Sequence, residues 1–247
     1  MPHGFDGAIL RVLGAKEHAL TVRGATRLAP HFLRVQFDAP TLFQQAVDSP
    51  AAWIRLWIVD PVTGIEFQRA YTIAAADVAA GRIDVDFLLH EPAGPASAWV
   101  SSASAGDQVI AQSLGSTSFA VAPEATGLTL IGDAASIPAI NAILRSLDPG
   151  AAVDVLLERS HDEDELIPLA DHQSAAVRWA PRTGPDSLAR AAADVLSPGK
   201  QVWAAGETGS LKALRTVIKE RVGGTRKSVH VQAYWIEGRA MGRERRL

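Results

Sequence analysis

The hydrophobic pattern of this 247-residue chain changes near residue 122. Before that point apolar and polar residues alternate over short stretches, as in residues 33–37 and 83–87. A period of two over short runs is typical of half-buried antiparallel strands. Turn signals such as Asp60-Pro61 and Ala105–Asp107 separate the stretches. Because closing a sheet on itself removes exposed strand edges, the pattern predicts a small antiparallel β-barrel.

The second half of the chain alternates apolar runs with helical periodicity. Nearly continuous apolar runs occupy residues 128–131, 153–157 and 202–205. Runs of this kind are typical of strands that are covered on both faces of a parallel sheet. Residues 137–147 and 211–222 carry apolar side chains at helical spacing, the second stretch after a possible cap at Ser210. We therefore predict two domains, an antiparallel β-barrel over residues 1–122 and an α/β domain with a parallel sheet and a basic tail over residues 123–247.

Composition excludes several classes of protein. A net charge of −3 and a pI near 6.2 argue against a nucleic-acid binder. The absence of cysteine excludes disulfides and thiolate-held iron–sulfur clusters in this chain. No apolar stretch approaches the roughly 18 residues that a membrane helix needs. The first residues lack a basic region followed by an apolar core, so we do not expect them to be a signal peptide. We expect a cytoplasmic protein without membrane insertion; its oligomeric state is left open.

No metal site is expected from the sequence. No two histidines have the i, i+4 spacing of a zinc helix. The acidic run from His161 to Glu165 has consecutive carboxylates, which in a helix would fan around the axis instead of converging. We interpret that run as the solvated start of a helix, with acids near the positive end of its dipole.

Three motifs lie close together between residues 69 and 99. They are Arg69-Ala70-Tyr71-Thr72, a strand-like stretch over residues 83–90, and the segment Gly94–Trp99. The first supplies a forked cation suited to a pyrophosphate, a flat ring, and a small hydroxyl donor. The third could expose backbone N–H groups to a phosphate at the start of a helix. Together the three motifs suit a flavin dinucleotide.

This ordered trio resembles the siderophore-interacting proteins, a branch of the ferredoxin-reductase superfamily that carries FAD and reduces ferric chelates. The resemblance covers roughly residues 19–239. It implies that Arg69 meets the FAD phosphates, that Tyr71 lies against the isoalloxazine, and that Thr72 sits near the reactive nitrogen. The remaining residues that it assigns to the dinucleotide are Asp86 and Phe87 (through their backbone), His90, Gly94, Ala96 and Ser97.

In the second domain the resemblance implies a site for NADH or NADPH at the strand ends. Gly132-Asp133 and Gly206-Glu207 would border it, and Trp235 would lie over the exposed face of the flavin. The family often has Glu-Thr directly after the first of these dipeptides, whereas this chain has Ala134-Ala135, so a hydroxyl that could meet a nicotinamide or a phosphate is lost unless Ser136 replaces it. Use of a pyridine nucleotide is therefore an expectation from kinship.

The candidates for substrate binding are Arg55 and Arg239. Arg55 lies where the family commonly places a lysine near the iron-chelate pocket, and a cation there would attract an anionic chelate. Two other basic positions of the family are apolar here, at Leu114 and Ile236. Arg239 or Arg243 would compensate, and the charge of the substrate stays open.

The predicted function is that of an FAD-dependent oxidoreductase that reduces ferric siderophores or related ferric chelates and so releases iron. A hydride from NADH or NADPH would pass to FAD, which would deliver electrons singly to iron. No side chain would act as nucleophile or general acid, and iron would arrive with the substrate. Two alternatives remain: a flavin reductase that serves a partner protein, and a non-enzymatic carrier of flavin or ferric chelate.

Overall fold

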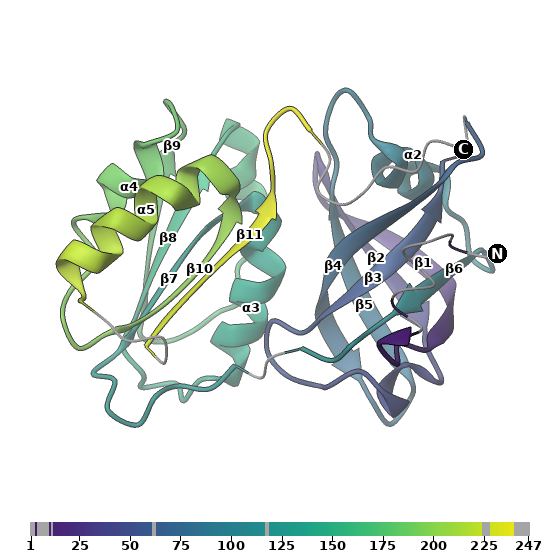
Figure 1. The fold of residues 1–247 in the computed structure, drawn as a ribbon, viewed down its shortest axis with the longest axis horizontal. Coiled ribbons are helices and arrows are strands. Elements are labelled where there is room, and N and C mark those ends of the chain that lie inside the picture. Colours follow the sequence, from purple (N-terminus) through teal and green to yellow (C-terminus); the bar gives the residue numbers. More distant parts are fainter. Residues whose placement is uncertain are drawn as a thin grey trace. The chain divides into compact units, whose positions relative to one another are not determined.

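The computed structural model describes residues 3, 10, 12–60, 63–116, 119–223 and 228–239. The chain divides into two compact units, the first running to Phe119 and the second starting at Ala120 (Figure 1). The first is a closed antiparallel barrel and the second contains a parallel sheet, so the predicted two-domain fold is confirmed. The basic tail over residues 240–247, including Arg243, lies outside the described residues.

The barrel closes in the order β1-β2-β5-β4-β3-β6. Its strands are β1 (Glu17–Ala29), β2 (Phe32–Asp38), β3 (Trp53–Val59), β4 (Glu66–Asp77), β5 (Arg82–Leu88) and β6 (Gln108–Gln112). A short helix, η1 (Leu42–Gln44), follows β2, and the helix α2 (Pro95–Ser102) joins β5 to β6.

Alternating residues of the strands fill the interior of the barrel, as the period of two predicts. On β5, Ile83, Val85 and Phe87 are buried in the core, together with Val35 and Phe37 of β2. This inward set comes from the same alternating stretches that are visible in the sequence.

The ladder between β4 and β5 covers only part of the two strands. It runs from Asp77 to Ile73, which pairs with Val85, and it contains a bulge between Ile73 and Ala75. Beyond Ile73, Tyr71 and Thr72 pair with β3, and Phe87 pairs with β2. Within the described residues no ladder joins Tyr71 or Thr72 to β5. The facing edges of these two strand segments are therefore not paired with each other, and we call this unpaired stretch, between Tyr71–Thr72 and Phe87, the open segment of the barrel wall.

The second unit is a five-stranded parallel sheet in the order β11-β10-β7-β8-β9. Its strands are β7 (Leu128–Asp133), β8 (Val153–Arg159), β9 (Ala175–Pro181), β10 (Gln201–Glu207) and β11 (Val229–Trp235). Its helices are η2 (Ala134–Ser136), α3 (Ile137–Ser146), η3 (Asp162–Leu166), α4 (Ser187–Ala192) and α5 (Thr208–Arg221). All residues of β7 and of β10 are buried, which explains their continuous apolar runs.

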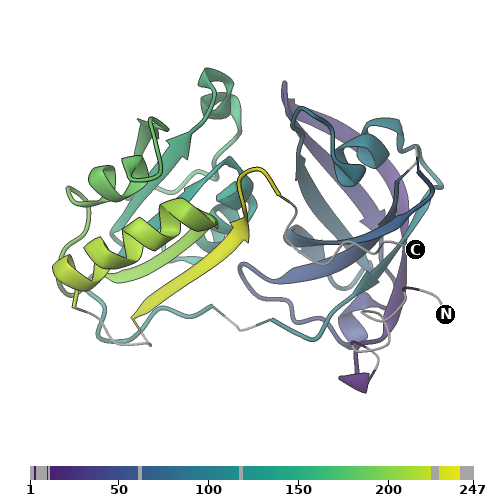
Figure 2. The same cartoon turned by 45° about the horizontal axis from the view of Figure 1, so that its top comes forward.

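Helices α4 and α5 lie side by side on one face of this sheet (Figures 1 and 2). Leu188, Leu211 and Leu214 pack there against Ile131 of β7. Helix α5 begins at Thr208, so the predicted cap at Ser210 is wrong. Glu207 is the cap, because its carboxylate accepts the Ser210 N–H at 2.9 Å.

Gly132 is predicted to be required for the turn that follows β7. A Cβ on Gly132 would overlap Ser136 Oγ and would lie 2.8 Å from the Ala205 carbonyl oxygen. We expect Gly132→Ala to destabilise the second unit by about 1–3 kcal/mol, as overpacked cores do. Gly150→Ala is the control, because a Cβ there meets nothing within 4 Å. Denaturant unfolding of the two variants should give clearly different midpoints; equal midpoints would contradict the close approach.

Candidate functional site

Tyr71 and Thr72 lie beside the open segment of the barrel wall. Thr72 is buried, and the half-buried Tyr71 packs against the barrel core. The Tyr71 and Phe87 ring centroids are 4.4 Å apart, with an interplanar angle of 42°. Burial raises the pKa of the Tyr71 phenol, while the charge of Arg69 acts in the opposite direction. The phenol is therefore neutral at physiological pH, and it forms an aromatic ledge next to a strand edge.

Arg69 lies two residues before Tyr71, on the same face of β4. Its guanidinium donates a hydrogen bond to the Gln68 carbonyl oxygen at 2.8 Å and lies 5.3 Å from the centroid of the Phe67 ring. The cation is thus held near the aromatic ledge by short-range contacts within its own strand. A forked donor in this position can bind an oxyanion.

The start of α2 lies close to His90. Gly94 is the N-cap residue in extended conformation, and the Ala98 N–H bonds back to its carbonyl oxygen at 2.9 Å. A Cβ on Gly94 would lie 3.3 Å from His90 Cε1, so glycine permits this approach. The amides of Ala96 and Ser97 belong to the first turn, whose N–H groups have no acceptor within the helix. Four of the predicted residues therefore come together at one helix start.

The side chains of Asp86 and Phe87 have structural roles. Arg34 donates two hydrogen bonds to the Asp86 carboxylate, at 2.7 and 2.8 Å. Phe87 is buried in the barrel core. These two residues could therefore contact a flavin only through their backbone N–H and C=O groups, as predicted from the sequence.

In the second unit, the Asp133 carboxylate binds groups of its own domain. Its Oδ2 accepts hydrogen bonds from Trp235 Nε1 at 2.7 Å and from the Glu207 N–H at 3.1 Å, and its Oδ1 accepts one from the Ala135 N–H at 3.0 Å. A Cβ on Gly206 would lie 2.7 Å from the same Oδ2, which explains the glycine. Asp133 thus joins the ends of β7, β10 and β11.

Arg182, which the sequence analysis missed, carries an ion network at the same edge of the sheet. Its guanidinium lies 2.8 Å from Glu158 Oε2, 3.0 Å from Glu237 Oε2 and 3.8 Å from Glu207 Oε2. The Arg182 guanidinium also lies 5.6 Å from the centroid of the Trp235 ring. An arginine directly after the β9 run was the only signal in the sequence. Three carboxylates thus surround one guanidinium at the carboxyl end of the strands.

The two candidate substrate residues belong to different units. Arg55 lies on β3, in register between Gln112 of β6 and Ala70 of β4, with its guanidinium 4.3 Å from the centroid of the Trp53 ring. Burial lowers the pKa of Arg55, which nonetheless stays cationic at neutral pH. Arg239 forms an isolated bridge with Ile236 in the second unit.

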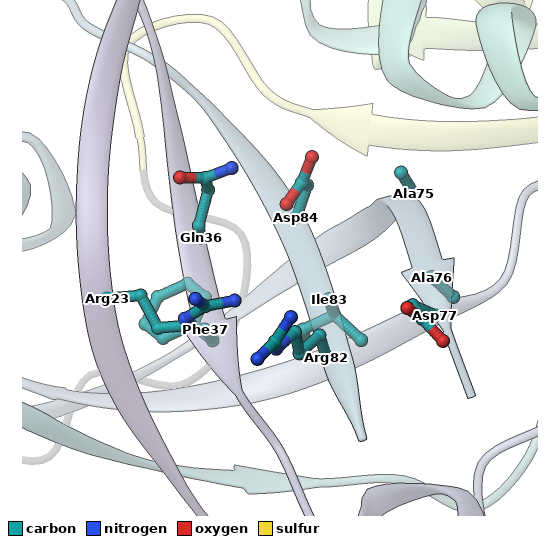
Figure 3. A pocket seen from close by; sticks show the side chains of 9 residues that line it. All are labelled: Arg23, Gln36, Phe37, Ala75, Ala76, Asp77, Arg82, Ile83 and Asp84. Carbon is teal, nitrogen blue, oxygen red and sulfur yellow. The ribbon is translucent and has the colours of Figure 1, made fainter. Parts of the chain in front are cut away.

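The barrel also has a cavity of about 210 Å³ that none of the predicted site residues lines (Figure 3). It is lined by Arg23, Gln36, Phe37, Ala75, Ala76, Asp77, Arg82, Ile83 and Asp84. None of these residues was predicted to bind the cofactor. The Nε atoms of Arg23 and Arg82 both lie 3.5 Å from Asp38 Oδ1, so their charges are partly neutralised.

No cluster of three or more His, Cys, Asp or Glu side chains is arranged to hold a metal ion within the described ranges. In that same part of the chain, none of the helices has the length and apolar character needed to cross a membrane.

The carboxyl group of Asp133 should titrate far from its usual range. Burial raises its pKa from 3.8 to about 6, although the hydrogen bonds from Trp235, Glu207 and Ala135 act in the opposite direction. Folding therefore disfavours the ionised form, and stability should fall as pH rises from about 4 to about 6 and then level off. A carboxyl ¹³C titration, with Asp133→Asn to assign the resonance, should give a midpoint near 6.

The variant Trp235→Phe should raise that midpoint further, because it removes a hydrogen bond to the ionised carboxylate. Trp179→Phe, on β9, is the matched control and should leave the midpoint unchanged. A wild-type midpoint near 4 would show that the carboxyl group is solvated.

Comparison with known proteins agrees with this arrangement. The model of the siderophore-interacting FAD-binding domain matches residues 65–113, and the model of the siderophore-interacting protein family matches residues 125–238. The chain is 26% identical to the ferric acinetobactin reductase of Acinetobacter baumannii, over 85% of the chain and 74% of that protein. A crystal structure of a siderophore utilization protein from T. fusca superposes with a TM-score of 0.80 at 26% identity, covering 92% of this chain and 95% of that one.

A further relative is longer than this chain. The mycobactin import ATP-binding/permease protein IrtA of Mycobacterium tuberculosis is 44% identical over 99% of the chain. The chain spans only 29% of the length of that relative. The two family matches, the barrel and the parallel sheet thus point to one conclusion. The chain belongs to the siderophore-interacting protein family and carries its FAD-binding domain.

Proposed function

We propose that this chain is an FAD-dependent oxidoreductase that reduces ferric siderophores or related ferric chelates, with electrons from NADH or NADPH. The observation that carries the proposal is the interrupted ladder between β4 and β5, flanked by Arg69, Tyr71 and Thr72. This feature lies within the segment that matches the FAD-binding domain. The name of the Acinetobacter relative, a ferric acinetobactin reductase, supports the substrate class.

The residues present fit a flavin dinucleotide in shape and charge. The aromatic ledge of Tyr71 offers a flat face, and the edges of β4 and β5 beside it offer backbone donors and acceptors. The guanidinium of Arg69 and the amides of the α2 first turn supply positive charge for a pyrophosphate. The bound FAD would supply the conversion of a two-electron donor into single electrons for iron.

The protein residues position and shield the reaction; none of them transfers a proton. The Tyr71 phenol stays neutral because burial raises its pKa. Phe87 closes the core behind the ledge and excludes water from that side. The Thr72 hydroxyl is a small donor beside the ledge. His90 and Gly94 shape the turn that would meet the dinucleotide.

The nicotinamide donor would bind at the carboxyl edge of the parallel sheet, near Gly132 and Gly206, where cofactors of such sheets are found. Asp133 and Glu207 contribute by holding the edge together, since their carboxylates bind groups of the same domain. Trp235 is oriented by Asp133 and would cover the flavin.

Arg55, and Arg239 in the second unit, would attract the ferric chelate. We place this reaction in the cytoplasm.

The alternatives make different use of the same flavin site. A flavin reductase would need a partner protein to reach iron, and a carrier would not accept electrons from either nucleotide. The Ala134-Ala135 and Ile236 departures keep the carrier under consideration. The hydroxyl of Ser136 at that strand end is already bonded to Asp133, since it accepts the Asp133 N–H at 2.9 Å and donates to the Asp133 carbonyl oxygen at 2.7 Å. Loss of flavin absorbance on anaerobic mixing with NADH or NADPH identifies an enzyme, whereas no loss with either nucleotide favours the carrier or an enzyme that uses another electron donor. Ferric-chelate turnover without a partner then separates the two enzymes.

Arg69→Ala should weaken FAD binding by at least about tenfold, because a charge-assisted hydrogen bond to phosphate is lost. The test is the flavin absorbance retained after reconstitution with FAD and gel filtration. Arg82→Ala, on the neighbouring strand and outside the proposed site, is the matched control and should keep the wild-type flavin content. Full retention of FAD by the Arg69 variant would remove this residue from the site.

Arg55→Gln should lower kcat/KM for an anionic ferric chelate by about three- to tenfold, since the local attraction is lost. FAD content should not change. The measurement is trapping of ferrous iron over a range of salt concentrations, with Arg27→Gln, exposed on β1, as control. If both variants lose activity equally, or neither does, Arg55 has no specific part in chelate capture.

A further inference from the structure

The segment that follows β8, residues 160–166, includes the short helix η3 and is called the β8 loop. It lies at the carboxyl edge of the sheet, next to the proposed nucleotide site. Glu158 of β8 pairs in register with Asp133 of β7, and Arg159 is the last residue of the strand. In dinucleotide-binding sheets, residues after the second strand meet the adenosine ribose. An acidic side chain there binds a ribose 2′-hydroxyl, and an arginine nearby accommodates a 2′-phosphate. Arg159 therefore lies where an arginine would meet a 2′-phosphate.

Two carboxylates of the loop neutralise Arg159. One guanidinium nitrogen forms an ion pair with Asp162, and Nε lies 2.9 Å from Glu165 Oε1. The Asp162 side chain is 91% exposed, whereas that of Arg159 is 27% exposed. The carboxylate of Asp162 is thus the more exposed member of this ion pair.

The backbone donors of the same loop are also occupied. Asp164 is buried, and its Oδ2 accepts the N–H groups of Ser160 at 2.7 Å and of His161 at 3.1 Å. These amides would otherwise be available to a phosphate. The two N–H groups are thus bonded within the protein and are not available to a phosphate.

The rest of this edge adds further negative charge. Glu158, Glu207 and Glu237 surround Arg182, so that guanidinium is committed to the protein as well. A 2′-phosphate would bring about −1.5 to −2 charges into this field at neutral pH. A ribose 2′-hydroxyl, in contrast, can donate a hydrogen bond to an exposed carboxylate such as Asp162.

We infer that Asp162 and Glu165 make this chain selective for NADH over NADPH, by holding Arg159 and repelling a 2′-phosphate. This specificity rests on the proposed function, because it concerns the electron donor of that reaction. The wild-type protein should prefer NADH by roughly tenfold or more in kcat/KM, as expected for like charges brought together.

The test compares the wild type with the double variant Asp162→Asn, Glu165→Gln. In this variant two carboxylates are replaced by uncharged amides of nearly the same shape. Oxidation of NADH and NADPH by the FAD-loaded protein gives the kinetic ratio. Calorimetric titration with ADP-ribose and 2′-phospho-ADP-ribose gives a binding ratio that does not depend on the flavin. The double variant should lower both ratios, of kcat/KM for NADH over NADPH and of affinity for ADP-ribose over 2′-phospho-ADP-ribose, by about tenfold. The change should come mainly from tighter binding of the phosphorylated ligand.

Two further variants control this comparison. Glu163→Gln removes an exposed carboxylate of the same loop that lies outside the described contacts of Arg159, and it should leave both ratios unchanged. Adding Arg159→Gln to the double variant should abolish its gain for the phosphorylated ligands, because the released cation is gone.

Several outcomes overturn the inference. They are equal use of the two nucleotides, a preference for NADPH, a double variant with unchanged ratios, and no binding or oxidation of either nucleotide. In the first three cases the reductase proposal is untouched, because either nucleotide can still supply its electrons. If neither nucleotide binds or is oxidised, reduction of a ferric chelate by the dithionite-reduced protein keeps the ferric-chelate part of the reductase proposal and removes the pyridine-nucleotide donor from it. A protein that takes up no FAD contradicts the reductase proposal, whereas the two ADP-ribose titrations still decide the specificity.

Discussion

Incomplete hydrogen bonding between β4 and β5 is the constraint on which the proposed flavin site depends. A closed barrel removes strand edges, and a strand edge that remains must find other partners for its N–H and C=O groups. Here the ladder stops at Ile73, just past a bulge. The rings of Tyr71 and Phe87 meet behind the opening and keep the core closed. The barrel therefore stays packed while presenting a polar strand edge and an aromatic face to a ligand.

The parallel sheet differs from the barrel, because the charged side chains at its carboxyl edge are paired with groups of the same domain. Asp133 binds three donors from three segments, and Arg182 is shared among three glutamates. Buried charges need such partners, since an unpaired one is costly. The network fixes Trp235 and the ends of β7, β10 and β11. Under the proposed function, recognition of the nicotinamide donor would therefore fall to the glycine turns and the exposed loops, of which the β8 loop is one.

The parts of the fold that could be predicted are those where burial leaves a local pattern. Residues 83–87 alternate because one face of β5 is buried, and residues 202–205 are continuously apolar because both faces of β10 are buried. The gap in the ladder could not be predicted, since it depends on pairing with distant strands. Nor could the network of Arg182, because an arginine after a strand is commonplace. Asp164, in the run interpreted as the solvated start of a helix, is buried in η3, because its carboxylate accepts two backbone N–H groups. The individual site residues were predicted from the resemblance to the siderophore-interacting proteins, and their roles in binding FAD remain proposals.

Hydrogen exchange of the protein with and without FAD tests the central claim most directly, because exchange rates report on individual backbone amides. If FAD binds in the open segment of the barrel wall, added FAD should slow exchange in β4 around Tyr71 and Thr72, in β5 around Phe87, and at the start of α2. Exchange around the cavity lined by Arg23 and Arg82 should stay the same. FAD that leaves the β4 and β5 amides unchanged, or that slows exchange only at that cavity, would contradict the account.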